Sequence, residues 1–330
     1  MLWINFKIIP MSDLNISKEK LEEYSGYKNP NTAFVYEMPP GLSDAIEVAI
    51  SLNQPLLITG EPGTGKTSLA EKVAFELSHI TGGKFRKEPY RFNTKSSSIF
   101  SDLFYTYDAM SHFYNANVKK DDNLQIKDFI ELNALGIAIV ASMNSDERMK
   151  IPARNIPSNP EPISSVVLID EIDKAPREFP NDLLNELENF CFTIKEAGAK
   201  QYQKSENSKI IVILTSNNEK DFPEPFLRRC IYFNIDFPSN DLLRKILEKH
   251  LLLRSLYGKE ELILEYFSDL RNICQYKKPS TAELIAWCKV IAQKRTDLYD
   301  KKAILETLPA IIKHRDDLDI VSEYFNKSLS

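Results

Sequence analysis

The sequence has few cysteines and no cysteine pattern that is typical of a metal or redox site. It contains four, at Cys191, Cys230, Cys274 and Cys288, and no two of them form a C-x-x-C pair. The four histidines are scattered along the chain, and none stands beside a cysteine at metal-ligand spacing. We therefore expect reduced and mostly buried thiols, no zinc site and no catalytic triad.

Long apolar runs and a strong charge of one sign are also absent. No stretch approaches the roughly 18 apolar residues of a membrane-spanning helix, and the net charge is only -5. The apolar first ten residues are interrupted by Asn5 and Lys7 and lack a basic leader, so we do not expect a signal peptide; Met11 is an alternative start. These features predict a cytoplasmic protein without a membrane partner, and they give no reason to expect nucleic acid as a partner.

The chain has 330 residues, a length that suggests about two domains. Residues 1–34 are expected to form a lead-in segment, which is polar and mixed from residue 12 onward. Residues 35–238 combine short apolar runs with helical patterns and predict an α/β domain, whereas residues 239–330 show helical periodicity alone and predict a smaller all-helical domain. Its expected helices are Asp241–Leu253, Glu260–Ile273, Thr281–Lys294, Ala303–His314 and Leu318–Leu329.

The stretch from Gly60 to Thr67 reads G-E-P-G-T-G-K-T, and its flanks fit a phosphate-binding loop. An apolar run, residues 55–59, precedes it as a short buried strand, and a helical pattern follows it. Strand, glycine-rich loop and helix are the context that a G-x-x-x-x-G-K-[ST] motif requires. The glycines let successive N–H groups point at phosphate oxygens, and the following helix adds its positive dipole end. The residues predicted to bind the nucleotide are Gly60, Glu61, Pro62, Gly63, Thr64, Gly65, Lys66, Thr67 and Ser68.

Two carboxylates follow a second apolar run, Val166–Ile169, which predicts another buried strand. Asp170 and Glu171 would then stand at the carboxyl end of this strand, where open parallel sheets bind ligands. We expect Asp170 and Thr67 to hold Mg²⁺, Lys66 to reach the phosphates and Glu171 to activate the attacking water. A strand that runs into a polar turn also produces such a string by chance. Here the two carboxylates come after the glycine-rich loop in the chain, and the two motifs together favour a nucleotide site.

Several further segments carry predictions of secondary structure. Lys209–Leu214 predicts a buried strand that is followed by Thr215, Ser216 and Asn217. Asn217 either contacts the γ-phosphate or the attacking water, or is simply a turn-forming residue. Helices are expected at Phe129–Ala141 and Asn181–Glu188, and a hairpin is expected from Phe192 to Ser208. The adjacent Arg228 and Arg229 are either surface charges or residues that act on a neighbouring subunit's nucleotide.

Taken together, these motifs resemble those of the AAA+ ATPases, and within them the MoxR-like group. The similarity is closest over residues 55–69, 166–176 and 213–230. The resemblance implies a P-loop NTPase core, in which helices flank a parallel sheet, and a small all-helical lid. It also implies ATP and Mg²⁺ as cofactors, a ring that is commonly a hexamer, and a protein client, in some cases with a von Willebrand factor A domain.

By position, the resemblance assigns Lys66 and Thr67 to Walker A, Asp170 and Glu171 to Walker B, and Asn217 to sensor 1. Arg229, with Arg228 beside it, matches the arginine finger. One departure is that Ala282 stands where many family members carry a lid arginine, called sensor 2. Lys277 and Lys278 are candidates to substitute for it, and the sequence leaves open which residue does. The expected function is an ATP-hydrolysing chaperone that remodels partner proteins. The alternatives are a nucleotide-gated scaffold with little turnover and a nucleic-acid-acting motor.

Overall fold

The computed structural model describes residues 36–119, 124–180, 183, 187, 189–250, 256 and 258–327. The expected lead-in segment and most of the expected helix at 181–188 lie outside these residues. Five strands form one parallel sheet in the order β2-β5-β8-β1-β9. They are β1 (Leu56–Gly60), β2 (Tyr90–Asn93), β5 (Ser165–Asp170), β8 (Ile210–Ser216) and β9 (Ile231–Ile235).

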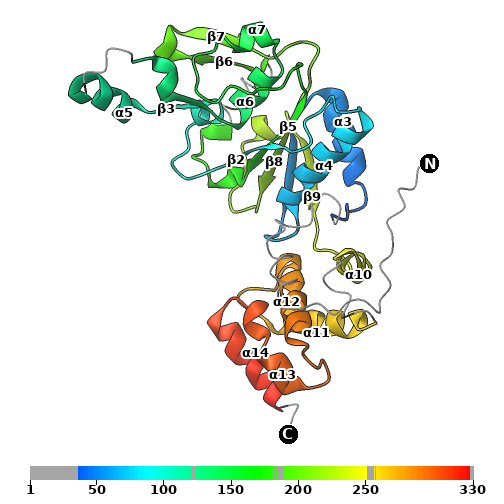
Figure 1. Cartoon of the computed structure of the whole chain (residues 1–330). Coiled ribbons are helices and arrows are strands. Elements are labelled where there is room, and N and C mark those ends of the chain that lie inside the picture. The colour runs from blue at the N-terminus through cyan, green and yellow to red at the C-terminus, as the bar shows by residue number, and fades with distance from the viewer. Residues whose placement is uncertain are drawn as a thin grey trace, which may run out of the picture.

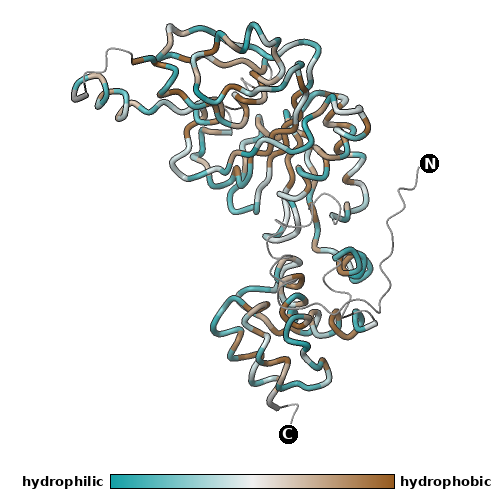
Figure 2. The backbone as a smooth tube through the Cα atoms, in the orientation of Figure 1, coloured by the Kyte–Doolittle hydropathy of each residue, from teal (hydrophilic) through white to brown (hydrophobic). Residues whose placement is uncertain are grey.

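Alternate residues of the strands face opposite sides of this sheet, as the period of a strand requires. On one side, Leu56 and Leu168 pack with the helices α3 (Leu42–Leu52) and α4 (Lys66–Ile80). On the other side, Leu57 and Val167 pack with α6 (Ala134–Ala141) and with the smaller hairpins. Both faces are covered, which explains why the strands read as continuous apolar runs. Figure 2 shows these apolar residues running through the sheet.

Two antiparallel hairpins and several short helical segments complete this part of the chain. The hairpins are β3 (Tyr105–Tyr107) with β4 (Ile130–Leu132), and β6 (Cys191–Ile194) with β7 (Lys200–Gln203). The second hairpin confirms the one expected from Phe192. The short segments are η2 (Phe100–Leu103), α5 (Ala109–Tyr114), η3 (Asn115–Lys119), η4 (Ile126–Phe129), α7 (Ser145–Arg148), η5 (Ile172–Lys174), η6 (Lys195–Ala197) and α9 (Glu224–Leu227).

The prediction of a helix over Phe129–Ala141 is wrong for its first residues. Residues 130–132 form β4, because they pair with β3 and because the Asn155 side chain bonds both the N–H and the C=O of Leu132. The helix begins only at Ala134. Gly136 within it is a packing requirement, since a Cβ there would stand 2.0 Å from the Phe104 carbonyl oxygen.

The region after Ile235 is helical, as expected, and has an apolar core of its own (Figure 1). Its elements are α10 (Asn240–Lys249), α11 (Glu260–Ile273), α12 (Thr281–Lys294), α13 (Lys301–Leu305), η8 (Leu308–Ala310) and α14 (Arg315–Lys327). We call this region the lid. The prediction of a single helix at 303–314 is wrong, because the helix is interrupted at Thr307. The Thr307 hydroxyl donates to the Ile304 carbonyl and accepts the indole N–H of Trp287.

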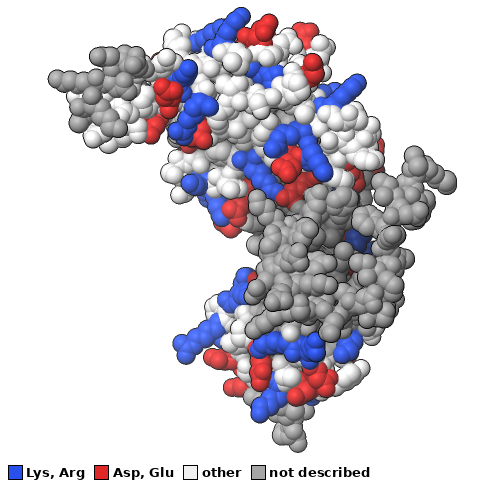
Figure 3. Space-filling model, in the orientation of Figure 1, with Lys and Arg blue, Asp and Glu red and all other residues white. Residues whose placement is uncertain are grey.

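Two composition-based expectations can be compared with the structure. All four cysteines are buried thiols, none of them in a disulfide within the described residues. Across the described residues, the helices are too short or too polar to cross a bilayer. On the face shown in Figure 3, basic and acidic side chains are interspersed.

Candidate functional site

The glycine-rich loop begins where β1 ends and closes where α4 begins. Gly60, Gly63 and Gly65 all have positive φ, and Gly65 caps α4. A Cβ on Gly60 would stand 2.5 Å from the carbonyl oxygen of Ile235 on the neighbouring strand β9. Glycine is therefore required here both for the backbone angle and for the close approach. Within the loop, the Thr64 hydroxyl donates to the Glu61 carbonyl at 2.9 Å.

Lys66 opens α4 and turns its side chain back over this loop. Its Nζ donates to the carbonyl oxygens of Gly60 at 2.8 Å and Glu61 at 2.9 Å, and only 6% of the residue is exposed. Burial lowers the pKa of Lys66, and the nearby carboxylates of Asp173, Asp170, Glu171 and Glu61 oppose that shift. The site thus holds a buried lysine beside the loop, with its side-chain nitrogen bonded to two uncharged carbonyl oxygens.

Strand order brings the loop next to the carboxylates. Because β8 lies between β1 and β5, its last residues stand between the glycine-rich loop and Asp170. The Thr67 hydroxyl lies 3.2 and 3.1 Å from the two carboxylate oxygens of Asp170, and the buried Thr215 hydroxyl also donates to Asp170. A hydroxyl and a carboxylate at one point are the oxygen donors that Mg²⁺ takes together with substrate phosphates. The donor set therefore fits the expected metal.

Glu171 takes a left-handed backbone conformation, with φ 56. Such angles are uncommon for residues other than glycine and persist where the surroundings impose them. Here the N–H of Glu171 donates to the Thr215 hydroxyl at 2.9 Å. Its carboxylate accepts the Asn217 amide at 3.4 Å and the Lys174 ammonium at 2.5 Å, and the latter bond raises the pKa of Lys174.

Asp173 is a residue of the site that sequence reasoning missed. It is 2% exposed, and its Oδ2 accepts the backbone N–H groups of Asn217 at 3.0 Å and Glu219 at 3.2 Å. It thereby fixes the segment after β8 so that the Asn217 amide faces Glu171. The sequence feature that could have identified Asp173 is the third carboxylate of the D-E-I-D string, three residues after Asp170.

The lid touches the glycine-rich loop at the start of α12. A Cβ on Gly63 would stand 2.5 Å from the Ser280 Oγ and 3.5 Å from the Ala282 Cβ. Lys277, one of the two lysines considered as substitutes for a lid arginine, donates to Glu283 of its own segment at 2.8 Å. The lid residue whose guanidinium approaches the loop is Arg271, which pairs with Glu61 at 3.2 Å.

Arg228 and Arg229 follow α9, and both side chains are exposed. Arg228 pairs with Glu224 at 2.5 Å. An arginine that acts on a neighbouring subunit's nucleotide must be exposed in a single chain, and both residues meet this requirement.

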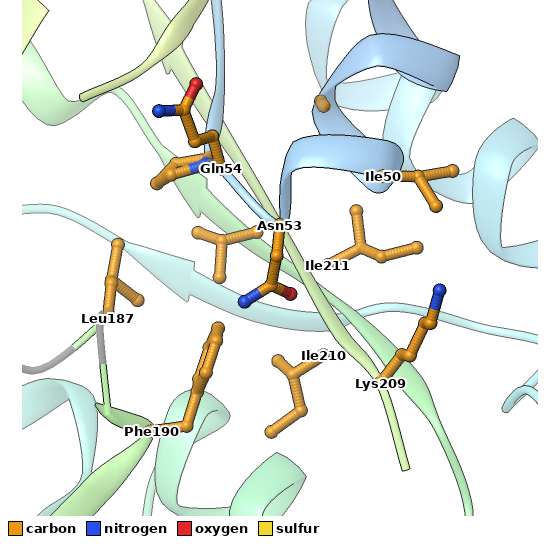
Figure 4. Close-up of a pocket in the computed structure, with 11 residues that line it drawn as sticks. Ile50, Asn53, Gln54, Leu187, Phe190, Lys209, Ile210 and Ile211 are labelled. Carbon is orange, nitrogen blue, oxygen red and sulfur yellow. The ribbon is translucent and has the colours of Figure 1, made fainter. Parts of the chain in front are cut away.

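An apolar hollow elsewhere in the fold is unrelated to these residues. Its lining comes from the amino-terminal ends of β1 and β8 and from the end of α3, at the opposite edge of the sheet (Figure 4). The space has room for about one water molecule.

Comparison with known proteins places the chain in a family. A family model described as "ATPase family associated with various cellular activities (AAA)" matches residues 56–239, which is more than half of the chain. A search among curated proteins found no significant match.

Solved structures with related folds have low sequence identity to this chain. A variant of RuvB from Thermotoga maritima has 16% identity and a TM-score of 0.42, and the match covers 81% of this chain and 66% of RuvB, just under two thirds. An ATPase candidate from Cytophaga hutchinsonii has 15% identity and a TM-score of 0.39, with coverage of 90% and 87%. NtrX from Brucella abortus has 14% identity and a TM-score of 0.36, with coverage of 88% and 52%. At these values the likeness carries no argument about function. The family model and the sheet with its glycine-rich loop lead to one conclusion: the chain belongs to the AAA ATPase family.

Proposed function

We propose that this protein is a Mg²⁺-dependent ATPase of the MoxR-like group that uses hydrolysis to remodel or activate a partner protein. The observation that carries the proposal is the hydrogen-bonded group at the carboxyl edge of the sheet. It joins Thr67 to Asp170, Asp170 to Thr215, Thr215 to Glu171, and Glu171 to Asn217. Lys66 stands beside it on the loop that connects β1 with α4.

Each residue has a separate role in this proposal. Thr67 and Asp170 would hold Mg²⁺, and the loop from Gly60 to Ser68, with Lys66, would hold the phosphates of ATP. When bound, Mg²⁺ and ATP supply a partly neutralised phosphoryl group that can be transferred to water. Glu171 accepts the proton of that water, and Asn217 orients the Glu171 carboxylate. Catalysis then consists of positioning and electrostatic stabilisation.

The proposal extends to the assembly and its surroundings. Arg229, with Arg228 beside it, would act on the nucleotide of a neighbouring subunit in a ring, which we propose to be a hexamer. The client would be a protein, and one with a von Willebrand factor A domain is a candidate. We place this activity in the cytoplasm.

The test is phosphate release by Glu171→Gln. Because the amide cannot accept the proton of water, turnover should fall by orders of magnitude while Mg-ATP still binds with the affinity of the wild type. Glu178→Gln, which changes an exposed glutamate seven residues further along, is the matched control and should keep full turnover. Normal phosphate release by Glu171→Gln would remove Glu171 from the mechanism.

A nucleotide-gated scaffold with little turnover is a second candidate. Ala282 favours it, because the lid carries no guanidinium at this position. A ring that assembles on Mg-ATP but releases almost no phosphate, even with its client, would support the scaffold. A nucleic-acid motor has less support, since the net charge is -5. Hydrolysis stimulated by DNA but not by proteins would support that motor.

A further inference from the structure

The Arg271 side chain, on α11 of the lid, is held by residues of three other segments of the chain. Its guanidinium lies 3.4 Å from the centre of the Phe237 ring, in the segment between β9 and α10. It donates to the carbonyl oxygen of Pro279, just before α12. It also pairs with Glu61 of the glycine-rich loop at 3.2 Å. One cation therefore joins the lid, the connection to the lid and the loop.

Two of these contacts fix the guanidinium independently of Glu61. The Phe237 ring stacks against the face of the guanidinium, and the Pro279 carbonyl accepts a hydrogen bond from one of its nitrogens. The Arg271 side chain is only 15% exposed. An arginine that is already ordered loses little further entropy when it binds a carboxylate. The pair with Glu61 should therefore lie at the strong end of the range for half-exposed ion pairs.

Glu61 connects this cation with the catalytic lysine. Its carboxylate faces Arg271, while its backbone carbonyl accepts the Lys66 ammonium at 2.9 Å. The Lys66 ammonium has three N–H donors, and two of them are bonded to the carbonyls of Gly60 and Glu61. The position of Glu61 therefore affects where the third donor can meet a phosphate. Glu61 thus contacts the lid through its side chain and Lys66 through its backbone carbonyl.

We propose that Arg271 is a positioning residue, which couples the lid to Lys66 through the side chain of Glu61. This inference rests on the proposed nucleotide site. It assigns to α11 a nucleotide-dependent role that does not involve the start of α12, where Ala282 stands. When the pair is intact, the lid holds the loop in a shape that is ready for phosphate. When the pair is broken, the nucleotide itself has to order the loop, and the affinity of the protein for the nucleotide falls because part of the binding free energy is used for this ordering.

The experiment is a double-mutant cycle on the affinity for Mg²⁺ and the slowly hydrolysed analogue ATPγS, measured by calorimetry. Arg271→Gln and Glu61→Gln should each weaken binding about fivefold, which is the upper end for an ion pair of this exposure. The double variant should be no weaker than either single one, because both remove the same interaction. Arg244→Gln is the matched control, since Arg244 pairs with Glu261 inside the lid and should keep the affinity of the wild type.

A second readout does not require nucleotide. In the nucleotide-free protein, amide hydrogen exchange over residues 60–66 should rise in Arg271→Gln and in Glu61→Gln, but not in Arg244→Gln. Glu61 is on a loop and its side chain is 54% exposed, so Glu61→Gln tests the idea even where Arg271→Gln unfolds the lid.

Three results would overturn the inference. One is wild-type affinity in both single variants, another is additive losses in the double variant, and the third is unchanged exchange in the loop. Failure of the wild type to bind Mg-ATPγS at all would instead contradict the proposed function, and the exchange experiment would still decide the role of Arg271.

Discussion

The Oδ2 atom of Asp173 accepts the backbone N–H of Asn217 at 3.0 Å. Asp173 follows β5 and Asn217 follows β8, so this bond joins the ends of two neighbouring strands. A second bond, from the N–H of Glu219 at 3.2 Å, closes the turn after β8 around the same oxygen. The Asn217 amide then lies within 3.4 Å of Glu171. The position of Asn217 beside Glu171 thus depends on the carboxylate of Asp173.

Replacing Asp173 should damage turnover more than nucleotide binding. Asp173→Ala leaves the N–H groups of Asn217 and Glu219 without an acceptor in a buried place, which costs about 2 kcal/mol in the free energy of unfolding. It also releases Asn217 from Glu171, so kcat should fall at least tenfold with little change in the Kd for Mg-ATP. Asp173→Asn keeps one oxygen acceptor and should recover part of the loss. Equal losses in kcat and affinity would contradict a positioning role.

Removal of the Thr215 hydroxyl should raise the Mg²⁺ requirement. This hydroxyl donates to Asp170 and accepts the N–H of Glu171 at 2.9 Å. Thr215→Val keeps the shape but leaves both groups without their partner, and a hydrogen bond to a charged group contributes about 1.5–3 kcal/mol. We expect the Mg²⁺ concentration for half-maximal phosphate release to rise, and kcat to fall about tenfold. Thr215→Ser, which keeps the hydroxyl, should behave much like the wild type; if it is as impaired as the valine variant, the hydroxyl is not the cause.

Gly63→Ala should disturb the contact between the loop and the lid. Its Cβ would stand 2.5 Å from the Ser280 Oγ, and its φ of 79 adds strain. We expect the affinity for Mg-ATP to fall at least tenfold, and Ser280→Gly in the same chain to restore part of it. Gly198→Ala is a matched control, because φ there is 80 and nothing lies within 4 Å of the new Cβ. Equal effects of the two alanines on affinity would show that the lid contact is unimportant.

Asp317 makes the stability of the lid depend on pH. Burial alone would raise its pKa, but the N–H groups of Lys277, Tyr276 and Gln275, and the nearby His314, lower the pKa overall. A carboxyl with a lowered folded-state pKa stabilises the fold above its unfolded value of about 3.9, and this stability is lost as the pH falls through the folded-state pKa. The segment held by Asp317 leads into α12, so this carboxylate also supports the contact with the loop.

The corresponding measurement is urea unfolding followed by the fluorescence of Trp287, which is fully buried in the lid. At pH 7, Asp317→Asn should lower the free energy of unfolding by about 2 kcal/mol, because it replaces a charged acceptor of three N–H groups. Below about pH 4 the difference from the wild type should shrink as the wild-type carboxyl is protonated. A difference that stays constant down to pH 3 would argue against this origin.

The parallel sheet and the helical lid could be predicted because their signals are local. Gly60, Lys66 and Thr67 stand in one continuous motif between a strand and a helix, and the carboxylates of Asp170 and Glu171 end a second apolar run. Strand ends in a parallel sheet meet at one edge, so the sequence could indicate that these residues lie together. Their roles in catalysis stay predictions.

The remaining features depend on contacts between distant segments, which periodicity does not reveal. The strand at 130–132 is too short to show alternation, and it exists because β3 and Asn155 lie beside it. The sequence did not indicate a role for Arg271. Its partners Phe237, Pro279 and Glu61 are brought to it by the fold and do not stand at a spacing that a sequence motif would reveal. Lys277 and Lys278 were candidates to replace the lid arginine, and Lys277 bonds Glu283 of its own segment.

The most direct test of the account is phosphate release from Mg-ATP measured over a range of protein concentrations, with Glu171→Gln and Arg229→Ala alongside. If subunits share the site, specific activity should rise with concentration, and both variants should be inactive while Glu171→Gln still binds Mg-ATP. A mixture of the two variants should recover part of the activity, because some interfaces then combine an intact Glu171 with an intact Arg229. A wild-type protein that binds Mg-ATP but releases no more phosphate than Glu171→Gln would contradict the account and favour the nucleotide-gated scaffold.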